Sequence, residues 1–317
     1  MNETHAIQIC GMMSFGIVVF DRDFKVHYWN RWMELYSGIS AEKITGSVIF
    51  DHFPNLNNPK FARNCKSLFT FGNYCFLSQK LHHYIFPFKP VSASDFHFDY
   101  MQQSGSMFPI REENGEIKYI CITVHDVTEL VAYEQRLLEI AKRDTLTGIY
   151  NRRYLEERMK EEFDKHKRYN RPLSLIVFDI DHFKRINDTC GHQFGDYILK
   201  TTVTALKPCL RNVDVFARYG GEEFCCVLPE THLGAAVNVA ERLRATIAEQ
   251  THSFNGMEIK ITISLGVADT DGRVETTDTF FKSADDALYE AKKSGRNKVV
   301  SVKDLKAPGS TTAYCHP

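Results

Sequence analysis

The chain has 317 residues, with 39 Lys and Arg against 40 Asp and Glu, and a formal net charge of −1. This balance excludes a broad basic face of the kind that holds nucleic acid, but a small phosphate pocket needs only a few well-placed cations. Hydrophobic residues make up 43% and charged residues 25%, which are ordinary globular values and exclude global disorder. At roughly 100–200 residues per domain, the length predicts two domains.

No apolar run is long enough to cross a bilayer, and the N-terminus lacks the basic start and apolar stretch of a signal peptide. The nine cysteines are odd in number, scattered along the chain and without a CxxC pair. We therefore expect a cytoplasmic protein with reduced thiols and no membrane span.

Residues 1–125 predict a small antiparallel sheet with short helices in its middle. Short alternating apolar segments, separated by turn residues, lie at 17–21, 26–29, 84–88, 97–100 and 117–125. The adjacent His82 and His83 would point to opposite faces of a strand, so exposed or hydrogen-bonded histidines are a better interpretation than haem ligands.

Residues 126–143 contain no Gly or Pro and carry apolar residues at helical spacing. These apolar residues are Val127, Leu130, Val131, Leu137, Leu138 and Ala141. Thr128 is a candidate N-cap for this segment. We predict a connecting helix that pairs with its twin in a homodimer.

Helices and strands alternate from residue 144 to about 305, which predicts mixed α/β elements over one sheet. Helices are expected at 154–168, 194–206, 233–249 and 278–293, and strands at 173–179, 213–218, 223–228, 258–267 and 298–302. Residues 306–317 are small and polar, and we expect a disordered tail there.

Four acidic residues lie at the end of a predicted strand and in a predicted hairpin turn of this domain. Asp179 ends an apolar strand, and the alternation with Asp181 puts both carboxylates on one face if the strand continues. Glu222 and Glu223 occupy a hairpin turn behind two glycines, which let the backbone approach a ligand closely. Each feature alone is better explained as a polar turn or an N-cap. If the hairpin lies beside the strand, however, the gathered carboxylates favour Mg²⁺ held together with substrate phosphates.

Two other segments carry groups suited to a nucleotide. The polar loop at 187–196 opens a helix, and Asn187 and Asp196 supply the donors and acceptors that a purine edge requires. Lys292 and Arg296 lie four residues apart around a helix end, a place where the helix dipole also favours cations.

Five stretches of the sequence, taken in chain order, resemble the GGDEF family of bacterial diguanylate cyclases over about residues 144–302. The matching stretches are DTLTGIYNRR at 144–153, FDIDHFKRIND at 178–188, GHQFGD at 191–196, RYGGEEF at 218–224 and ADDALYEAKKSGRN at 284–297. The signature is the Gly-Gly-Glu-Glu-Phe variant. The resemblance implies that two GTP condense to cyclic di-GMP and two pyrophosphates. Each domain would hold one GTP, so the active form would be a homodimer.

The resemblance also implies a role for each matching residue. The metal ligands for Mg²⁺ or Mn²⁺ would be Asp179, the carbonyl of Ile180, Glu222 and Glu223. Glu222 would also deprotonate the attacking 3′-hydroxyl. The guanine would be read by Asn187 and Asp196.

The phosphates would be held by a second set of residues. The triphosphate cradle would be His182, Phe183 and Lys184, and the phosphate charge would be stabilised by Lys184, Lys292 and Arg296. An RxxD pattern, Arg211 to Asp214, stands at the family's usual offset before the signature. With Arg242, it would bind cyclic di-GMP as an inhibitory product.

The N-terminal part resembles a PAS sensor domain at residues 16–38 and 114–129. This implies control of the cyclase through dimer geometry, and an unidentified ligand for the sensor. Two alternatives stay open: a GGDEF domain without catalysis that acts as a GTP or cyclic di-GMP receptor, and a dimeric sensor scaffold. The intact acids and guanine-reading residues favour the enzyme.

Overall fold

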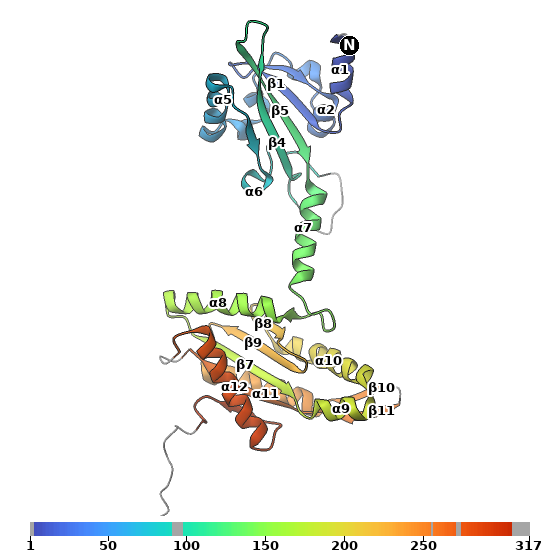
Figure 1. Cartoon of the computed structure of the whole chain (residues 1–317), viewed down its shortest axis with the longest axis vertical. Helices are drawn as coiled ribbons and strands as arrows, with labels where there is room; N and C mark the ends of the chain where they lie inside the picture. The colour runs from blue at the N-terminus through green and yellow to red at the C-terminus, as the bar shows by residue number, and fades with distance from the viewer. Residues whose placement is uncertain (1–2, 91–97, 255, 271–273, 306–317) are drawn as a thin grey trace, which may run out of the picture. The chain divides into compact units, whose positions relative to one another are not determined.

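The computed structural model describes residues 3–90, 98–254, 256–270 and 274–305. The chain divides into two compact units, residues 1–138 and 139–317 (Figure 1). The expected tail at 306–317 and the start of the expected strand at 97–100 lie outside the described residues. Among the helices that are described, none is both long and apolar enough to cross a membrane.

The N-terminal unit is built on a five-stranded antiparallel sheet in the order β2-β1-β5-β4-β3. Its strands are β1 (Gly16–Phe20), β2 (Val26–Trp29), β3 (Cys75–Leu77), β4 (Gln103–Arg111) and β5 (Ile117–Asp126). The short helices are α1 (Glu3–Met12), α2 (Arg31–Ser37), α3 (Ala41–Ile44), α4 (Ile49–His52), η1 (Pro54–Leu56), α5 (Pro59–Phe71) and α6 (Gln79–His82). The prediction of an antiparallel sheet with short helices in its middle is confirmed.

The strand expected at 84–88 is wrong, and residues 98–100 form no strand either. The fully buried side chain of Gln103 explains the first difference. Its Oε1 accepts the backbone N–H groups of Ile85 and Phe86, each at 2.9 Å, and its Nε2 donates to the carbonyl of Phe86 at 2.8 Å. The side chain therefore satisfies backbone groups that a neighbouring strand would otherwise pair.

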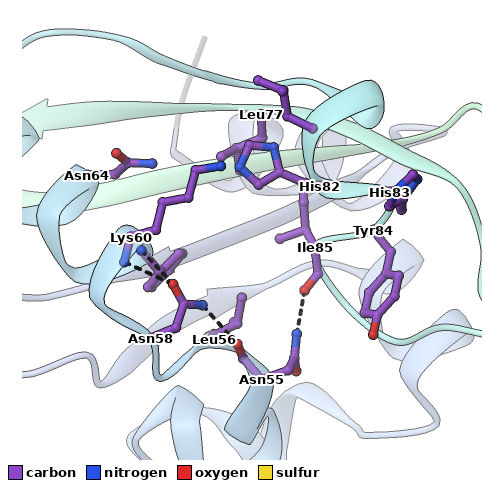
Figure 2. A pocket seen from close by; sticks show the side chains of 12 residues that line it. Asn55, Leu56, Asn58, Lys60, Asn64, Leu77, His82, His83, Tyr84 and Ile85 are labelled. Carbon is purple, nitrogen blue, oxygen red and sulfur yellow. Dashed lines mark hydrogen bonds between the residues drawn. The ribbon is translucent and has the colours of Figure 1, made fainter. Parts of the chain in front are cut away.

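A cavity of about 460 Å³ opens in this unit between η1, the start of α5 and residues 81–85 (Figure 2). His82 ends α6, and His83 follows it outside any strand. The expectation that these histidines lie in a strand and point to opposite faces is therefore wrong.

The connecting helix is α7 (Thr128–Ala141). Thr128 is not its N-cap: the carboxylate of Asp126 accepts the Thr128 N–H at 2.8 Å, while the buried Thr128 hydroxyl accepts the N–H of Gln102 at 2.9 Å. Val131 is buried, so it does not belong to the free face of the helix. The large exposed apolar side chains on α7 are Leu130, Tyr133, Leu137, Leu138 and Ile140.

The C-terminal unit holds a six-stranded mixed sheet in the order β13-β12-β7-β9-β8-β6. Its strands are β6 (Tyr150–Asn151), β7 (Leu173–Ile180), β8 (Val215–Arg218), β9 (Glu223–Pro229), β12 (Ile263–Asp269) and β13 (Val299–Ser301). The helices are α8 (Arg152–Tyr169), α9 (Phe183–Cys190), α10 (His192–Leu206), η2 (Lys207–Cys209), α11 (Leu233–Glu249) and α12 (Thr277–Lys293). The expected mixed sheet with helices is confirmed.

Two expectations for this unit need correction. The single strand expected at 258–267 is two strands in different sheets, because β11 (Met257–Lys260) pairs with β10 (Thr251–Phe254) and only β12 joins the main sheet. The polar loop expected at 187–196 is the end of α9 and the start of α10. Gly191, at φ 83°, joins the two helices in a conformation that favours glycine.

The alternating side chains of β7 build two cores, one on each face of the sheet. Ile176 and Phe178 pack in the core that α9, α10 and α11 cover, whereas Leu175 and Val177 pack in the core that α8 and α12 cover. Asp179 continues the second series. A Cβ on Gly266 of β12 would lie 2.1 Å from a backbone oxygen of α12, so glycine permits α12 to approach the sheet closely.

Candidate active site

The carboxylates of the strand end and of the hairpin lie on neighbouring strands. Asp179 pairs in register with Glu223 on β9, and the Ile180 N–H donates to the Glu222 carbonyl at 3.4 Å. A Cβ on Gly220 would lie 2.7 Å from a carboxylate oxygen of Glu223, so glycine leaves room for that side chain. The hairpin therefore lies beside the strand, as the gathering of carboxylates requires.

Asp179 is buried, and its carboxylate contacts the ammonium of Lys292 at 3.0 Å. Burial raises the pKa of Asp179 to about 6, against the opposing effect of Lys292 and with added repulsion from Glu222 and Glu223. Burial also raises the pKa of Glu222; Lys292 lowers it and Glu223 raises it. Three carboxylates thus share the neighbourhood of one ammonium, an arrangement that attracts further positive charge.

The fit to a divalent cation rests on the chemistry of these donors. In the part of the chain that the structure describes, no three His, Cys, Asp or Glu side chains stand close enough to form a metal site by themselves. Carboxylate oxygens are nevertheless the donors that Mg²⁺ prefers, and Mg²⁺ commonly takes one or two carboxylates and completes its shell with water and substrate phosphates. Asp179, Glu222 and Glu223 fit that incomplete type of site.

Asp181 does not join this group, although it follows Asp179 by two residues. Its buried carboxylate accepts hydrogen bonds from the hydroxyls of Thr262 and Ser264, both at 2.6 Å, and from the backbone N–H of Asn297 at 3.0 Å. It therefore ties the end of β7 to the segment after α12. The alternation of Asp179 and Asp181 in the sequence predicts a shared face, but it gives no sign of this tether.

Asn187 lies in a cradle that only glycine can form. Its Oδ1 is buried and has no hydrogen-bond partner among the described residues. A Cβ on Gly195 would lie 1.9 Å from that oxygen, so glycine makes the space for the amide. Asp196 follows directly on α10 and is exposed. Asn187 thus lies against the residue that precedes Asp196, and its Oδ1 is an acceptor left unpaired for a ligand donor.

The residues expected around the phosphates lie at two helix ends. His182, at φ 58°, precedes α9, and buried Phe183 and exposed Lys184 are in its first turn, whose N–H groups lack helical partners. Lys292 is in the last turn of α12, and Arg296 follows at φ 61° with an exposed side chain. Among the described residues, neither Lys184 nor Arg296 makes an ion pair, whereas Lys292 is paired with Asp179.

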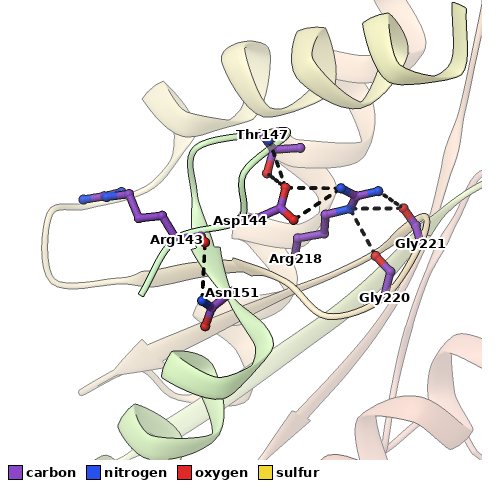
Figure 3. Close-up of polar contacts among 7 residues, drawn as sticks. All are labelled: Arg143, Asp144, Thr147, Asn151, Arg218, Gly220 and Gly221. Carbon is purple, nitrogen blue, oxygen red and sulfur yellow. Dashed lines mark hydrogen bonds and ion pairs between the residues drawn. The ribbon is translucent and has the colours of Figure 1, made fainter. Parts of the chain in front are cut away.

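One ion pair anchors the signature hairpin, and our sequence reasoning gave its members no role. Arg218 donates through Nη1 to Asp144 at 3.2 Å, through Nη2 to the Gly221 carbonyl at 2.7 Å and through Nε to the carbonyls of Gly220 and Gly221 at 3.1 Å (Figure 3). Asp144 also accepts the N–H and hydroxyl of Thr147. Burial opposes ionisation of Asp144, but Thr147 and Arg218 outweigh it and lower its pKa. Asp144 and Arg218 are the first residues of two of the family motifs, at 144–153 and 218–224, and this is the sequence signal that could have identified the pair.

The RxxD residues lie at a different place in the unit. The Arg211 N–H donates to Asp214 at 2.8 Å, and Arg242 donates to the Cys209 carbonyl at 2.7 Å. Burial raises the pKa of Asp214, against the attraction of Arg211 and Arg242, and its Oδ1 has no partner among the described residues. Arg211 and Asp214 line a cavity of about 450 Å³ with residues of α8.

Comparison with known proteins identifies the C-terminal unit. Residues 141–298 match the family described as diguanylate cyclase, GGDEF domain. Diguanylate cyclase DgcM of Escherichia coli K12 is 40% identical over 187 residues, which are 59% of this chain and 44% of that protein. Response regulator PleD of Caulobacter vibrioides is 41% identical over 165 residues, which are 51% of this chain and 36% of PleD. This chain therefore spans less than half the length of either relative.

A solved structure matches the fold of the same region. The GGDEF domain of DgcB from Caulobacter crescentus, in complex with c-di-GMP, superimposes with a TM-score of 0.50 at 30% sequence identity. The match covers 51% of this chain and 96% of that one. The family match begins at residue 141, close to the start of the second unit at residue 139.

Proposed function

We propose that this chain, which belongs to the GGDEF family of diguanylate cyclases through residues 141–298, condenses two GTP into cyclic di-GMP and two pyrophosphates. The observation that carries the proposal is the group of neighbouring carboxylates Asp179, Glu222 and Glu223, with the ammonium of Lys292 paired to Asp179. The relatives named as diguanylate cyclases support it. GTP is therefore the substrate, and the chain works in the cytoplasm, where GTP is made.

The carboxylates would hold Mg²⁺ or Mn²⁺, with Asp179, Glu222, Glu223 and the carbonyl of Ile180 as its protein ligands. When bound, the cation would neutralise charge that develops on the phosphates and would lower the pKa of the attacking hydroxyl. With a cation held there, Asp179 would no longer depend on Lys292 for charge neutralisation, and the Lys292 ammonium could contact a phosphate oxygen.

Glu222 is the residue we assign to the proton of the 3′-hydroxyl. Its raised pKa makes it a stronger base than an ordinary surface carboxylate. The hydroxyl oxygen attacks the α-phosphorus of the GTP on the facing domain, the bond to pyrophosphate breaks, and the proton passes to the carboxylate. Lys184, Lys292 and Arg296 would stabilise the charge on the phosphates, with His182 and Phe183 beside them at the start of α9.

Guanine recognition falls to Asn187 and Asp196. The unpaired Oδ1 of Asn187 can accept a donor on the purine edge, and the carboxylate of Asp196 can accept others. A pocket that hydrogen-bonds a base selects strongly against a base without those donors, because its buried groups are then left unpaired. We therefore expect GTP to be preferred over ATP.

Two domains must face each other, because each holds one GTP. On α7, Leu130, Tyr133, Leu137 and Ile140 are each at least 60% exposed, and their alternating spacing of three and four residues is that of a coiled-coil seam. We propose that this stripe pairs with its copy in a homodimer. Residues 1–125 would be a PAS-like sensor, 126–143 the connecting helix and 144–305 the cyclase domain.

Product control would act at Arg211, Asp214 and Arg242. The unpaired Oδ1 of Asp214 and the adjacent cavity support a ligand there. The guanidinium groups would pair with the phosphates or guanines of cyclic di-GMP. Replacing Arg211 and Asp214 by Ala should leave the initial rate unchanged and abolish inhibition by added product.

The alternative is a receptor that binds GTP or cyclic di-GMP without turnover. Glu222→Gln distinguishes the two, because the amide keeps the size of the side chain but does not accept the proton. A cyclase should lose turnover and still bind GTP. If the unsubstituted chain binds GTP but makes no cyclic di-GMP after carried-over product is removed, the receptor is the better account.

A further inference from the structure

The segment that forms the cavity of the N-terminal unit is free of acidic residues. From residue 52 to residue 90 there is no Asp or Glu, although the chain as a whole has 40. The same stretch contains five Lys and Arg, namely Lys60, Arg63, Lys66, Lys80 and Lys89. The local charge is therefore positive, in a chain whose net charge is close to zero.

Three polar side chains converge in the cavity (Figure 2). Lys60 and Asn64 come from one face of α5, and His82 comes from the end of α6; the ammonium of Lys60 points toward the imidazole ring. Neither the ammonium of Lys60 nor the amide of Asn64 makes a hydrogen bond or ion pair with another described residue. The Nδ1 of His82 faces the carbonyl of Ser78 at 3.1 Å and so donates to it, leaving Nε2 for a ligand.

Apolar side chains form the rest of the lining. Leu56, Phe61, Leu77 and Ile85 are buried residues of the unit's core, and they also border the cavity. The volume of about 460 Å³ is within the range of small-molecule pockets. Converging donors above an apolar wall suit a ligand with an anionic head and an apolar body.

We propose that this cavity binds a small organic carboxylate with an apolar tail. The carboxylate would pair with the ammonium of Lys60 and accept from the amide of Asn64, beside the imidazole of His82, and the tail would lie against Leu56 and Phe61. No acidic side chain lines the cavity to compete for the cations.

The backbone at the rim of the cavity is strained. His83 has φ 57° and ψ −55°, and the Tyr84 N–H donates to the His82 carbonyl at 2.6 Å. This is the rare form of γ-turn, and positive φ strains the backbone of a residue that carries a side chain. Such strain is typical of places where a ligand is held, and His83 itself lines the cavity.

Hydrogen bonds and an ion pair connect α6, which borders the cavity, to the first turns of the connecting helix α7. Gln79, in the same short helix as His82, donates to the side chain of Gln102 at 2.7 Å, and the Gln102 N–H donates to Thr128 of α7 at 2.9 Å. Lys80 forms an ion pair with Glu134 of α7 at 3.2 Å. A ligand that shifts α6 would therefore act first on the N-terminal turns of α7.

Binding of octanoate to the full chain tests the proposal without any use of turnover. Isothermal titration calorimetry should detect one octanoate per chain, and Lys60→Gln should weaken binding about tenfold. Lys66→Gln is the matched control, because Lys66 is an exposed lysine of the same helix that does not line the cavity. It should leave binding unchanged. The neutral analogue 1-octanol and inorganic phosphate should both bind at least tenfold more weakly than octanoate.

Several results would overturn the proposal. No heat with octanoate at millimolar concentration would remove the site. Equal weakening by the two lysine substitutions would show general attraction to a positive surface. Octanol as tight as octanoate would remove the role of the charge, and phosphate as tight as octanoate would reduce the cavity to a simple anion site. Both lysines are exposed, so neither substitution should prevent folding.

Discussion

Arg218 joins Asp144, which lies three residues beyond the end of α7, to the carbonyl groups of the signature hairpin. One guanidinium thus holds both the start of the C-terminal unit and the turn that precedes Glu223. Its side chain is 16% exposed and that of Asp144 is 21% exposed, so the pair is partly shielded from water. This contact gives the segment after the connecting helix a direct hold on Gly220 and Gly221.

Arg218→Lys should therefore damage turnover while keeping the charge. A lysine ammonium cannot span a carboxylate and two carbonyls in the manner of a planar guanidinium. We expect at least a tenfold loss of the rate of GTP turnover and about 1–2 kcal/mol less stability in urea unfolding. Arg153→Lys, in an exposed helical pair with Glu157, is the control and should change neither. Equal rates for the two variants would contradict the anchoring role.

Asp179 should lower stability at neutral pH when no metal is present. The pKa of Asp179 is about 6 in the folded chain and near 3.9 in the unfolded chain. Because the folded chain binds this proton more tightly, the protonated carboxyl contributes stability that is fully present below about pH 4 and is lost as pH rises through 6. Asp179→Asn stays neutral. In EDTA at pH 7, we expect this variant to be about 2 kcal/mol more stable than the unsubstituted chain, and inactive.

Urea unfolding between pH 4 and pH 7 measures this difference. The gain of Asp179→Asn should grow as pH rises through that range, whereas Asp188→Asn, at an exposed position of α9, should give no such trend. If Asp179→Asn shows no gain in stability over the unsubstituted chain at any pH in this range, the account of the buried carboxylate is contradicted.

Asp181→Asn should disturb the segment that carries Arg296. An amide cannot accept all three hydrogen bonds that the carboxylate accepts, and its NH₂ group would face a donor. We expect about 2 kcal/mol less stability and a higher KM for GTP, because the N–H of Asn297 loses its acceptor. Arg296→Ala in the same background should then cost less than it does alone. Full additivity of the two effects would mean that Asp181 does not position Arg296.

The exposed stripe of α7 should set the oligomeric state. Leu137→Glu would place a charge at the centre of the proposed seam and should convert a dimer to a monomer in sedimentation velocity, with loss of turnover at low protein concentration. Gln135→Glu adds the same charge outside the stripe and should preserve the dimer. A dimer unaffected by Leu137→Glu would place the interface elsewhere.

The sequence predicted the parts of this chain that local patterns determine. The buried strand that ends near Asp179 and the helix at 233–249 follow from hydrophobic periodicity. The sequence predicts that carboxylates gather if the hairpin lies beside that strand, and the structure adds the register in which Asp179 pairs with Glu223. Tertiary contacts decided what the patterns could not: Gln103 replaces a strand partner at 85–86. The Asp181 tether to Asn297 likewise joins residues 116 positions apart, a distance that no local pattern spans.

The ratio of products formed by the purified full chain tests the central claim most directly. After carried-over cyclic di-GMP is removed, the chain should be incubated with GTP and Mg²⁺, and cyclic di-GMP and pyrophosphate quantified together. We predict two pyrophosphates for each cyclic di-GMP, and a specific activity that falls as the chain is diluted below its dimerisation constant. Absence of cyclic di-GMP while GTP binds normally would contradict the account.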